Sequence, residues 1–222
     1  MQNLINERSN GRGCLILDGG FSTCLESCGV ELDKDLWSGL AVRDCRKKVV
    51  QCHANFHSHG ADIVTASTYQ MTFEGLAQAT PGWTVKDSKA HMLDALQAVR
   101  DAQSSCSSSP KPPLVAASIG PYGAFLADGS EYTGTYGADP SVDLMSWHRP
   151  RLDVMTSIEG GADVIACETI PCIAEVKALR TLLDGHMPTW MSVSIKDGRH
   201  LNSGEALEDL CRAFEDPDDC AL

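Results

Sequence analysis

The chain has 222 residues, of which 43% are hydrophobic, with a formal net charge of −12 and an isoelectric point near 4.9. This length and hydrophobic content are sufficient for one domain with a buried core, and we treat residues 1–222 as a single domain. The excess of acidic residues argues against nucleic acid and anionic membrane surfaces as partners, because both require clustered Lys and Arg. The composition therefore favours a small-molecule ligand, and a cationic one would suit it best.

The sequence also predicts a compartment. Residues 1–13 are polar and lack the apolar centre of a signal peptide, and no apolar run approaches the roughly 20 residues of a membrane helix. The ten cysteines are scattered and include no Cys-x-x-Cys pair, so we expect free thiols in place of disulfides or a zinc ribbon. These features indicate a soluble, cytoplasmic protein.

Short apolar runs alternate with helical patterns along the chain. Runs of the kind found in buried parallel strands occupy residues 14–18, 61–68, 114–120, 162–168 and 189–195. Helices are predicted for residues 43–59, 85–103, 141–159, 173–183 and 205–214, with a kink at Pro150 in the third. Residues 122–140 form a long connection of the type that often carries functional side chains.

Repeated strand and helix units of this size predict a parallel sheet, in either an open doubly wound fold or a closed (β/α)8 barrel. The joint Gly-Ala-Asp occurs twice before a strand, at residues 60–62 and 161–163. Polar residues end several strands, namely Asp18, Ser67, Thr68, Ser118 and Glu168. This placement fits a barrel, whose active sites lie at that face, although an open sheet also binds ligands at the carboxyl ends of its strands.

Two of these strand ends carry carboxylates that we expect at one rim of the sheet. Asp18 and Glu168 could bind an ammonium group or perform acid/base chemistry, although each could instead cap the following helix. Gly19 and Gly20 follow the first acid and leave backbone N–H groups open to an anion. The combination is suited to a small zwitterion.

Other reactive residues favour structural interpretations. His53 and His57 lie four residues apart, as a metal pair would, but on an outer helix, so we expect solvated surface histidines. Cys24 and Cys28 are one helical turn apart and are expected to face the core. Cys167 should point away from the acid that follows it and pack against helices.

A series of short motifs runs in order along nearly the whole chain. They are Leu17-Asp18-Gly19-Gly20, Leu36-Trp37-Ser38, Gly60-Ala61-Asp62, Thr65-Ala66-Ser67-Thr68-Tyr69-Gln70, Gly120-Pro121-Tyr122-Gly123-Ala124, Leu126-Ala127-Asp128-Gly129-Ser130-Glu131-Tyr132, Glu168-Thr169-Ile170-Pro171 and Ser194-Ile195-Lys196-Asp197-Gly198. Together they resemble the homocysteine S-methyltransferase family. The blocks around Tyr122 and Tyr132 are the most specific part of this resemblance.

The resemblance implies an α/β fold, a (β/α)8 TIM barrel of which about the first five to six β/α units are present in this chain. In it, Asp18 and Glu168 hold the amino group of homocysteine. It further implies that the Gly19 and Gly20 amides, with Thr68, meet the carboxylate. The family transfers a methyl group from a sulfonium donor to the homocysteine thiol and so gives methionine, which places it in methionine biosynthesis. S-methylmethionine is the preferred donor over S-adenosylmethionine, because no separate nucleotide-binding motif is present.

The family also uses zinc, held by three cysteines, to convert the thiol to a thiolate. The corresponding segments, of the Gly-Ile-Asn-Cys and Gly-Gly-Cys-Cys type, would follow Leu222, and Cys220 does not match either. We therefore expect no zinc ligand and no identifiable catalytic residue in this chain, an open barrel, and no methyltransferase activity from these 222 residues. On this interpretation the sequence is a fragment, an imperfect gene model or a truncated product.

Two further functions remain open from the sequence. A barrel hydrolase or aldolase could use Asp18 and Glu168 as acid and base without zinc. Alternatively, a catalytically inactive, truncated barrel could act as a binding or oligomerising protein by pairing its open edge with a second copy or another partner.

Overall fold

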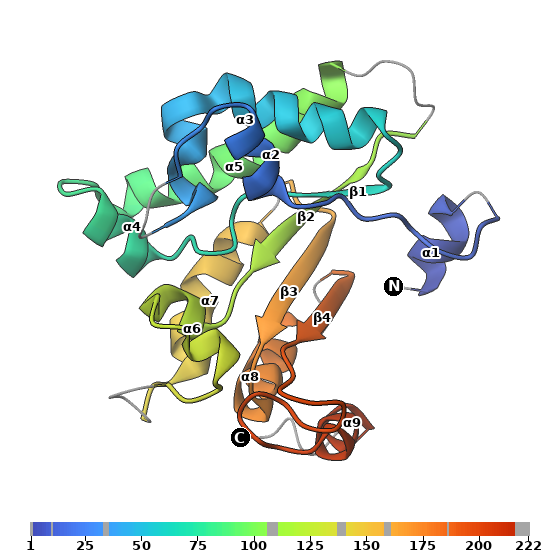
Figure 1. Cartoon of the computed structure of the whole chain (residues 1–222), viewed down its shortest axis with the longest axis vertical. Helices are drawn as coiled ribbons and strands as arrows, with labels where there is room; N and C mark the ends of the chain where they lie inside the picture. The colour runs from blue at the N-terminus through green and yellow to red at the C-terminus, as the bar shows by residue number, and fades with distance from the viewer. Residues whose placement is uncertain are drawn as a thin grey trace.

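A parallel sheet of four strands lies at the centre of the protein, in the order β1-β2-β3-β4 (Figure 1). A computed structural model describes residues 2–9, 11–32, 36–105, 111–136, 141–157, 161–185 and 187–215. The strands are β1 (Ile63–Thr65), β2 (Leu114–Ile119), β3 (Val164–Ile170) and β4 (Thr189–Val193). Each lies within or close to a predicted apolar run, and all pair in parallel as expected.

The helices between the strands agree with the predicted ranges to within a few residues. The long ones are α3 (Ala41–Ser58), α5 (Val85–Ser105), α7 (Leu144–Met155), α8 (Ile173–Leu183) and α9 (Leu207–Glu215). Pro150 lies within α7, which continues on both sides of it. The shorter elements are α1 (Gln2–Arg8), α2 (Phe21–Ser27), α4 (Phe73–Ala79), α6 (Tyr122–Leu126), and the 3₁₀ turns η1 (Ser38–Leu40) and η2 (Ser130–Tyr132). In the described part of the chain, no helix combines the length and apolarity needed to cross a bilayer.

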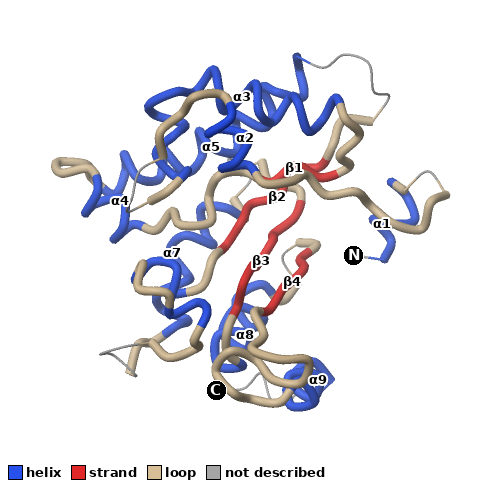
Figure 2. Tube along the Cα trace, viewed as in Figure 1, coloured by secondary structure: helices blue, strands red, loops and turns tan. Residues whose placement is uncertain are grey.

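The strand order distinguishes between the two fold classes left open by the sequence. Consecutive strands are neighbours throughout, without the reversal that defines a doubly wound sheet. Right-handed crossovers between such strands place every helix on the same side of the sheet, which is how a (β/α)8 barrel is built. In Figures 1 and 2, α3 and α5 lie above the strands and α7 to their left, around the outside of the curved sheet. The architecture is therefore a partial α/β barrel.

Alternation along the strands divides the buried side chains into two sets. One set, including Val115, Ile165 and Cys167, belongs to the large core shared with the helices. The other set includes Leu114 and Ala166 on the opposite, barrel-interior face. Because both faces are covered, the strands are almost continuously apolar. Cys167 is fully buried on the helix side, as predicted.

The predicted first strand is the main difference from the expected fold. Residues 14–18 run extended beside β1 but form only an isolated bridge, between Leu17 and Ile63. Asp18 N–H donates to the carbonyl of Ile63 at 3.0 Å, and Asp62 N–H donates to that of Ile16 at 2.7 Å. Ile16 and Leu17 are about half exposed, at 46% and 49%. The neighbouring β1 has only three residues, so the ladder is too short for a regular strand.

The repeated Gly-Ala-Asp joint performs the same structural role in both places. The Asp62 carboxylate accepts the backbone N–H of Ile16 at 2.8 Å and pairs with Arg12 at 2.5 Å. The Asp163 carboxylate accepts the N–H of Val115 at 2.8 Å and pairs with Arg100 at 2.9 Å. Each aspartate therefore holds the start of its strand against the preceding extended segment.

Candidate functional site

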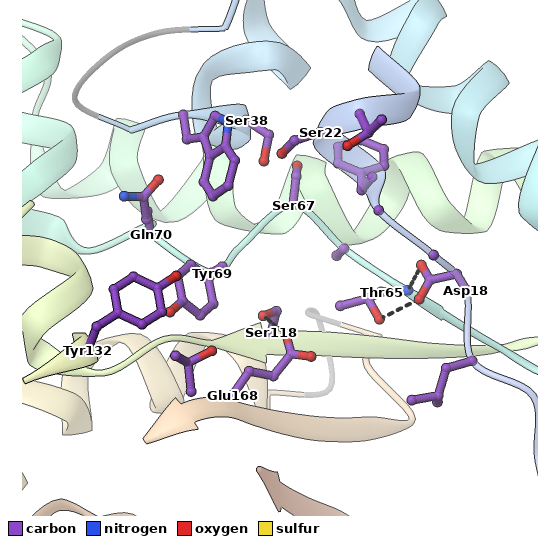
Figure 3. A pocket seen from close by; sticks show the side chains of 18 residues that line it. Asp18, Ser22, Ser38, Thr65, Ser67, Tyr69, Gln70, Ser118, Tyr132 and Glu168 are labelled. Carbon is purple, nitrogen blue, oxygen red and sulfur yellow. Dashed lines mark hydrogen bonds between the residues drawn. The ribbon is translucent and has the colours of Figure 1, made fainter. Parts of the chain in front are cut away.

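A cavity of about 400 Å³ opens at the carboxyl ends of the strands (Figure 3). Asp18, Thr65, Ser118 and Glu168 line it and come from four neighbouring extended segments. Side chains at these positions share the barrel-interior face because they alternate with the residues that pack against the helices. The site therefore lies where active sites of parallel barrels are found.

Asp18 is held in the cavity by one neighbouring residue of β1. Its carboxylate accepts the backbone N–H of Thr65 at 2.7 Å and the Thr65 hydroxyl at 3.0 Å (Figure 3). Burial raises the pKa of Asp18 to about 6, against the lowering effect of the Thr65 hydrogen bonds and with a further contribution from the negative charge of Glu168. The group is thus poised to change charge near neutral pH.

Glu168 lies across the cavity at the end of β3. It accepts a hydrogen bond from the Ser118 hydroxyl at 2.5 Å, and burial raises its pKa although this hydrogen bond lowers it. In the described part of the chain, neither acid is paired with a Lys, Arg or His. The structure therefore brings the two predicted acids into one cavity without a cation of the protein. Such a site can hold an ammonium group.

The wall facing the acids is rich in hydroxyl groups. Gly19 and Gly20 line the cavity just before α2 begins. Three serines from different segments, Ser22, Ser38 and Ser67, line it as well. In Figure 3 the three serine side chains point toward one another on the same side of the cavity. The Ser67 hydroxyl oxygen is buried and has no hydrogen-bond partner among the described residues. This wall offers donors to an anion.

Thr68 does not occupy the position expected of it. The side chain is fully buried, and its hydroxyl donates to the carbonyl of Ser118 at 2.8 Å. It is not among the residues that line the cavity, whereas the preceding Ser67 is. The chain turns after β1, so that Ser67 faces the cavity at the place expected for Thr68. The Thr68 hydroxyl instead connects this segment to β2.

Aromatic side chains surround the mouth of the cavity, a feature not predicted from the sequence. Trp37, Tyr69 and Tyr132 line it, and Trp37 and Tyr132 are exposed over 50% and 65% of their surface. Trp37 has φ of 48° and Thr169, beside Glu168, has φ of 63°, both in the left-handed region that ordinary residues avoid. Backbone strain of this kind concentrates at functional sites.

Two glycines in the connection after β2 lie so close to other backbone atoms that neither position has room for a side chain. A Cβ on Gly120 would lie 2.7 Å from the carbonyl oxygen of Tyr69, and one on Gly123 would lie 2.5 Å from the nitrogen of Glu131. These contacts pack the connection against the cavity wall and bring Tyr132 to its mouth. They give a physical reason for the Gly-Pro-Tyr-Gly motif.

A buried polar network behind this connection was also missed. Glu175 of α8 accepts the backbone N–H of Tyr122 at 2.7 Å, the Tyr136 hydroxyl, and His148 Nε2 at 2.7 Å. Arg151 is 2% exposed and donates to the carbonyl of Gly120. The network joins α7 and α8 to the segment that carries Tyr132. Nothing in the sequence pairs these residues, which are far apart along the chain.

The cavity does not fit the zinc ion implied by the family resemblance. Zinc in proteins is bound mainly by Cys and His. No Cys or His is among the described residues that line the cavity, and Cys167 points to the opposite side of β3. We therefore derive no chemical step through a metal at these residues.

The two histidines predicted to be solvated are buried instead. His53 is fully buried and stacks on Phe21 with ring centroids 4.4 Å apart, and His57 is only 8% exposed. Burial lowers the pKa of His53 to about 3. The prediction was wrong because α2 packs across this face of α3, which the helical spacing alone does not show. Cys24 and Cys28 face the core, as predicted.

Comparisons with known proteins agree with the motifs. The family described as Homocysteine S-methyltransferase matches residues 15–222. Homocysteine S-methyltransferase YbgG of Bacillus subtilis is 39% identical over 209 residues, covering 91% of this chain and 65% of that protein. Homocysteine S-methyltransferase 1 of Zea mays is 38% identical over 212 residues, covering 90% and 64%. The metallated crystal structure of homocysteine methyltransferase MmuM from Escherichia coli superposes with a TM-score of 0.86 at 33% identity, covering 95% of this chain and 73% of that one.

Proposed function

Because the chain belongs to the homocysteine S-methyltransferase family, we propose that its cavity binds homocysteine for methylation by a sulfonium donor. The chain spans about two thirds of the length of the curated relatives it matches, 65% of the first, so the reaction is proposed for the whole protein. The observation that carries the proposal is the pair of partly buried carboxylates, Asp18 and Glu168, in one cavity where no Lys, Arg or His of the described residues pairs with them.

The ammonium group of homocysteine would lie between these two acids. Its charge replaces the missing cation and favours the ionised form of both carboxylates. The substrate carboxylate would meet the amides of Gly19 and Gly20 together with the hydroxyl groups on that wall, among which Ser67 is unpartnered. Thr68 is left out of this assignment because its hydroxyl is already used.

The methyl donor would approach from the aromatic mouth. A sulfonium group is cationic, and aromatic faces attract cations. Trp37, Tyr69 and Tyr132 therefore suit S-methylmethionine or S-adenosylmethionine, and the former remains preferred. In the transfer, the homocysteine sulfur attacks the methyl carbon in line with the departing sulfur. One C–S bond forms, the sulfonium C–S bond breaks, the thiol proton passes to solvent, and the donor leaves as a thioether.

Calorimetric titration of homocysteine tests the role of the two acids. Asp18→Asn and Glu168→Gln should each weaken binding by about 2–4 kcal/mol, roughly 30- to 1000-fold in Kd, because each removes one partner of a desolvated charge pair. Glu26→Gln is the matched control, since Glu26 is exposed on α2 and lies outside the cavity. Unchanged affinity in both cavity variants would remove these residues from the site.

A turnover assay separates the enzyme from the binding-only alternative. Methionine formed from homocysteine and S-methylmethionine, with Zn²⁺ supplied, would identify a methyltransferase, and S-adenosylmethionine in a parallel assay compares the donors. The assay requires the whole protein, because the 222 residues alone are expected to be inactive; tight homocysteine binding by the whole protein without methionine from either donor would support the inactive binding protein instead.

A further inference from the structure

Three cysteines meet where α2 packs on α3, away from the cavity lining. Cys24 lies on α2, Cys28 is the residue that directly follows this helix, and Cys52 approaches them from α3. Their Sγ atoms all lie within 4.8 Å of one another, and the Sγ atoms of Cys28 and Cys52 are 3.9 Å apart. No other group of three or more His, Cys, Asp or Glu residues is as close in the described part of the chain.

The 3.9 Å between the Sγ atoms of Cys28 and Cys52 matches the spacing in metal thiolates, and the other two Sγ separations are at most 4.8 Å. Two sulfur atoms that each lie about 2.3 Å from a tetrahedral ion are about 3.8 Å apart. Cys24 and Cys28 are partly exposed, whereas Cys52 is fully buried. The trio is therefore open to solvent on one side, which gives an ion a path of entry and leaves one position for water.

We propose that Cys24, Cys28 and Cys52 form a three-thiolate site for a soft divalent cation of the zinc and cadmium class. Thiolate ligands select such ions over Mg²⁺ and Ca²⁺, which prefer oxygen. As each Sγ–metal bond forms, one S–H bond breaks, and three protons pass to solvent. The ion offsets most of the charge that three thiolates would place in the interface. The site uses none of the residues that line the cavity.

The ion would fasten α2 to α3. At one end of α2, Phe21 stacks on His53, and beyond its other end Lys48 Nζ donates to the carbonyl of Gly29 at 3.1 Å. The metal would add a third attachment between these two. Because α2 begins directly after Gly19 and Gly20, such an attachment would also fix the anion-binding wall of the cavity.

Titration of the reduced chain with Cd²⁺ tests this site through the ultraviolet charge-transfer band of cadmium thiolates. We expect one tight equivalent. Cys24→Ala and Cys28→Ala should weaken it about 100-fold and lower the band, because each removes a ligand. Cys14→Ala and Cys211→Ala are the matched controls, since both cysteines are exposed and lie outside the trio. Undiminished binding in both trio variants would overturn the proposal.

Alkylation of the unmodified chain gives a second test that does not depend on how the variants fold. Cd²⁺ should protect the two partly exposed members of the trio, Cys24 and Cys28, from iodoacetamide, as seen by peptide mass spectrometry, while Cys14 and Cys211 remain labelled. Cd²⁺ should also raise the melting temperature of the chain. Protection of other cysteines in place of the trio would contradict the proposal, as would an unchanged labelling pattern.

Discussion

Asp18 and Glu168 face each other in a cavity that withdraws them from water. Desolvation raises the pKa of each, and the repulsion between the two negative charges adds to the effect on Asp18. Their hydrogen-bond donors, Thr65 and Ser118, hold them in position without neutralising them. In the free site, the ionised form of both carboxylates is therefore destabilised, and a bound cation would stabilise it.

This gives a pH dependence for ligand binding. Asp18 is protonated below its pKa of about 6 and then no longer attracts an ammonium group. The affinity for homocysteine should fall by up to about tenfold per pH unit as the pH is lowered from about 7.5 to about 5. Calorimetry in buffers across this range measures it. In Asp18→Asn the dependence should be shallower, and equal slopes for both proteins would contradict the assignment.

The repeated Gly-Ala-Asp joint shows how elements are held in register. Asp62 and Asp163 each bind a backbone N–H of the preceding extended segment and an arginine from another element. A strand that slipped by one residue would turn its apolar side chains to the wrong face. The sequence shows the joint twice, but only the structure shows that each aspartate accepts a hydrogen bond from the backbone of the neighbouring extended segment.

Asp163→Ala should destabilise the protein by about 1–3 kcal/mol, because the buried N–H of Val115 loses its partner. Denaturant unfolding measures the change in the free energy of unfolding. Asp153→Ala is a suitable control, since Asp153 is an exposed residue of α7. A change of the same size in both variants would show that the joint has no special role.

Buried histidines determine how the whole molecule responds to acid. Burial lowers the pKa of His53 from 6.5 to about 3, and it also lowers that of His148 to about 4, with the positive charge of Arg151 contributing. The unfolded chain binds these protons at a higher pH than the folded one, so stability is lost as the pH falls below about 6.5. Asp18 acts in the opposite direction between 3.8 and about 6, but with the smaller shift.

The free energy of unfolding should therefore decrease as the pH is lowered from about 7 to about 4, with His53 contributing about 1.4 kcal/mol per pH unit below its unfolded pKa. His53→Phe keeps a ring against Phe21 and removes the titration, so its slope should be shallower. His59→Gln, at an exposed position, should keep the slope of the original protein. Parallel curves for all three would exclude His53 as the cause. Denaturant unfolding at each pH provides the measurement.

The amino-acid sequence alone was sufficient to predict the long helices, the four strands of the parallel sheet and the two acids at the strand ends, but not the short helices or the single bridge formed by residues 14–18. Those properties follow from local periodicity and from the rule that parallel strands end at one edge. It could not determine that Ser67 and not Thr68 faces the cavity, that His53 is covered, or that Cys52 meets Cys24 and Cys28. Each of these depends on how one element packs against another that is distant in sequence, and the side chains making such contacts have no fixed spacing along the chain.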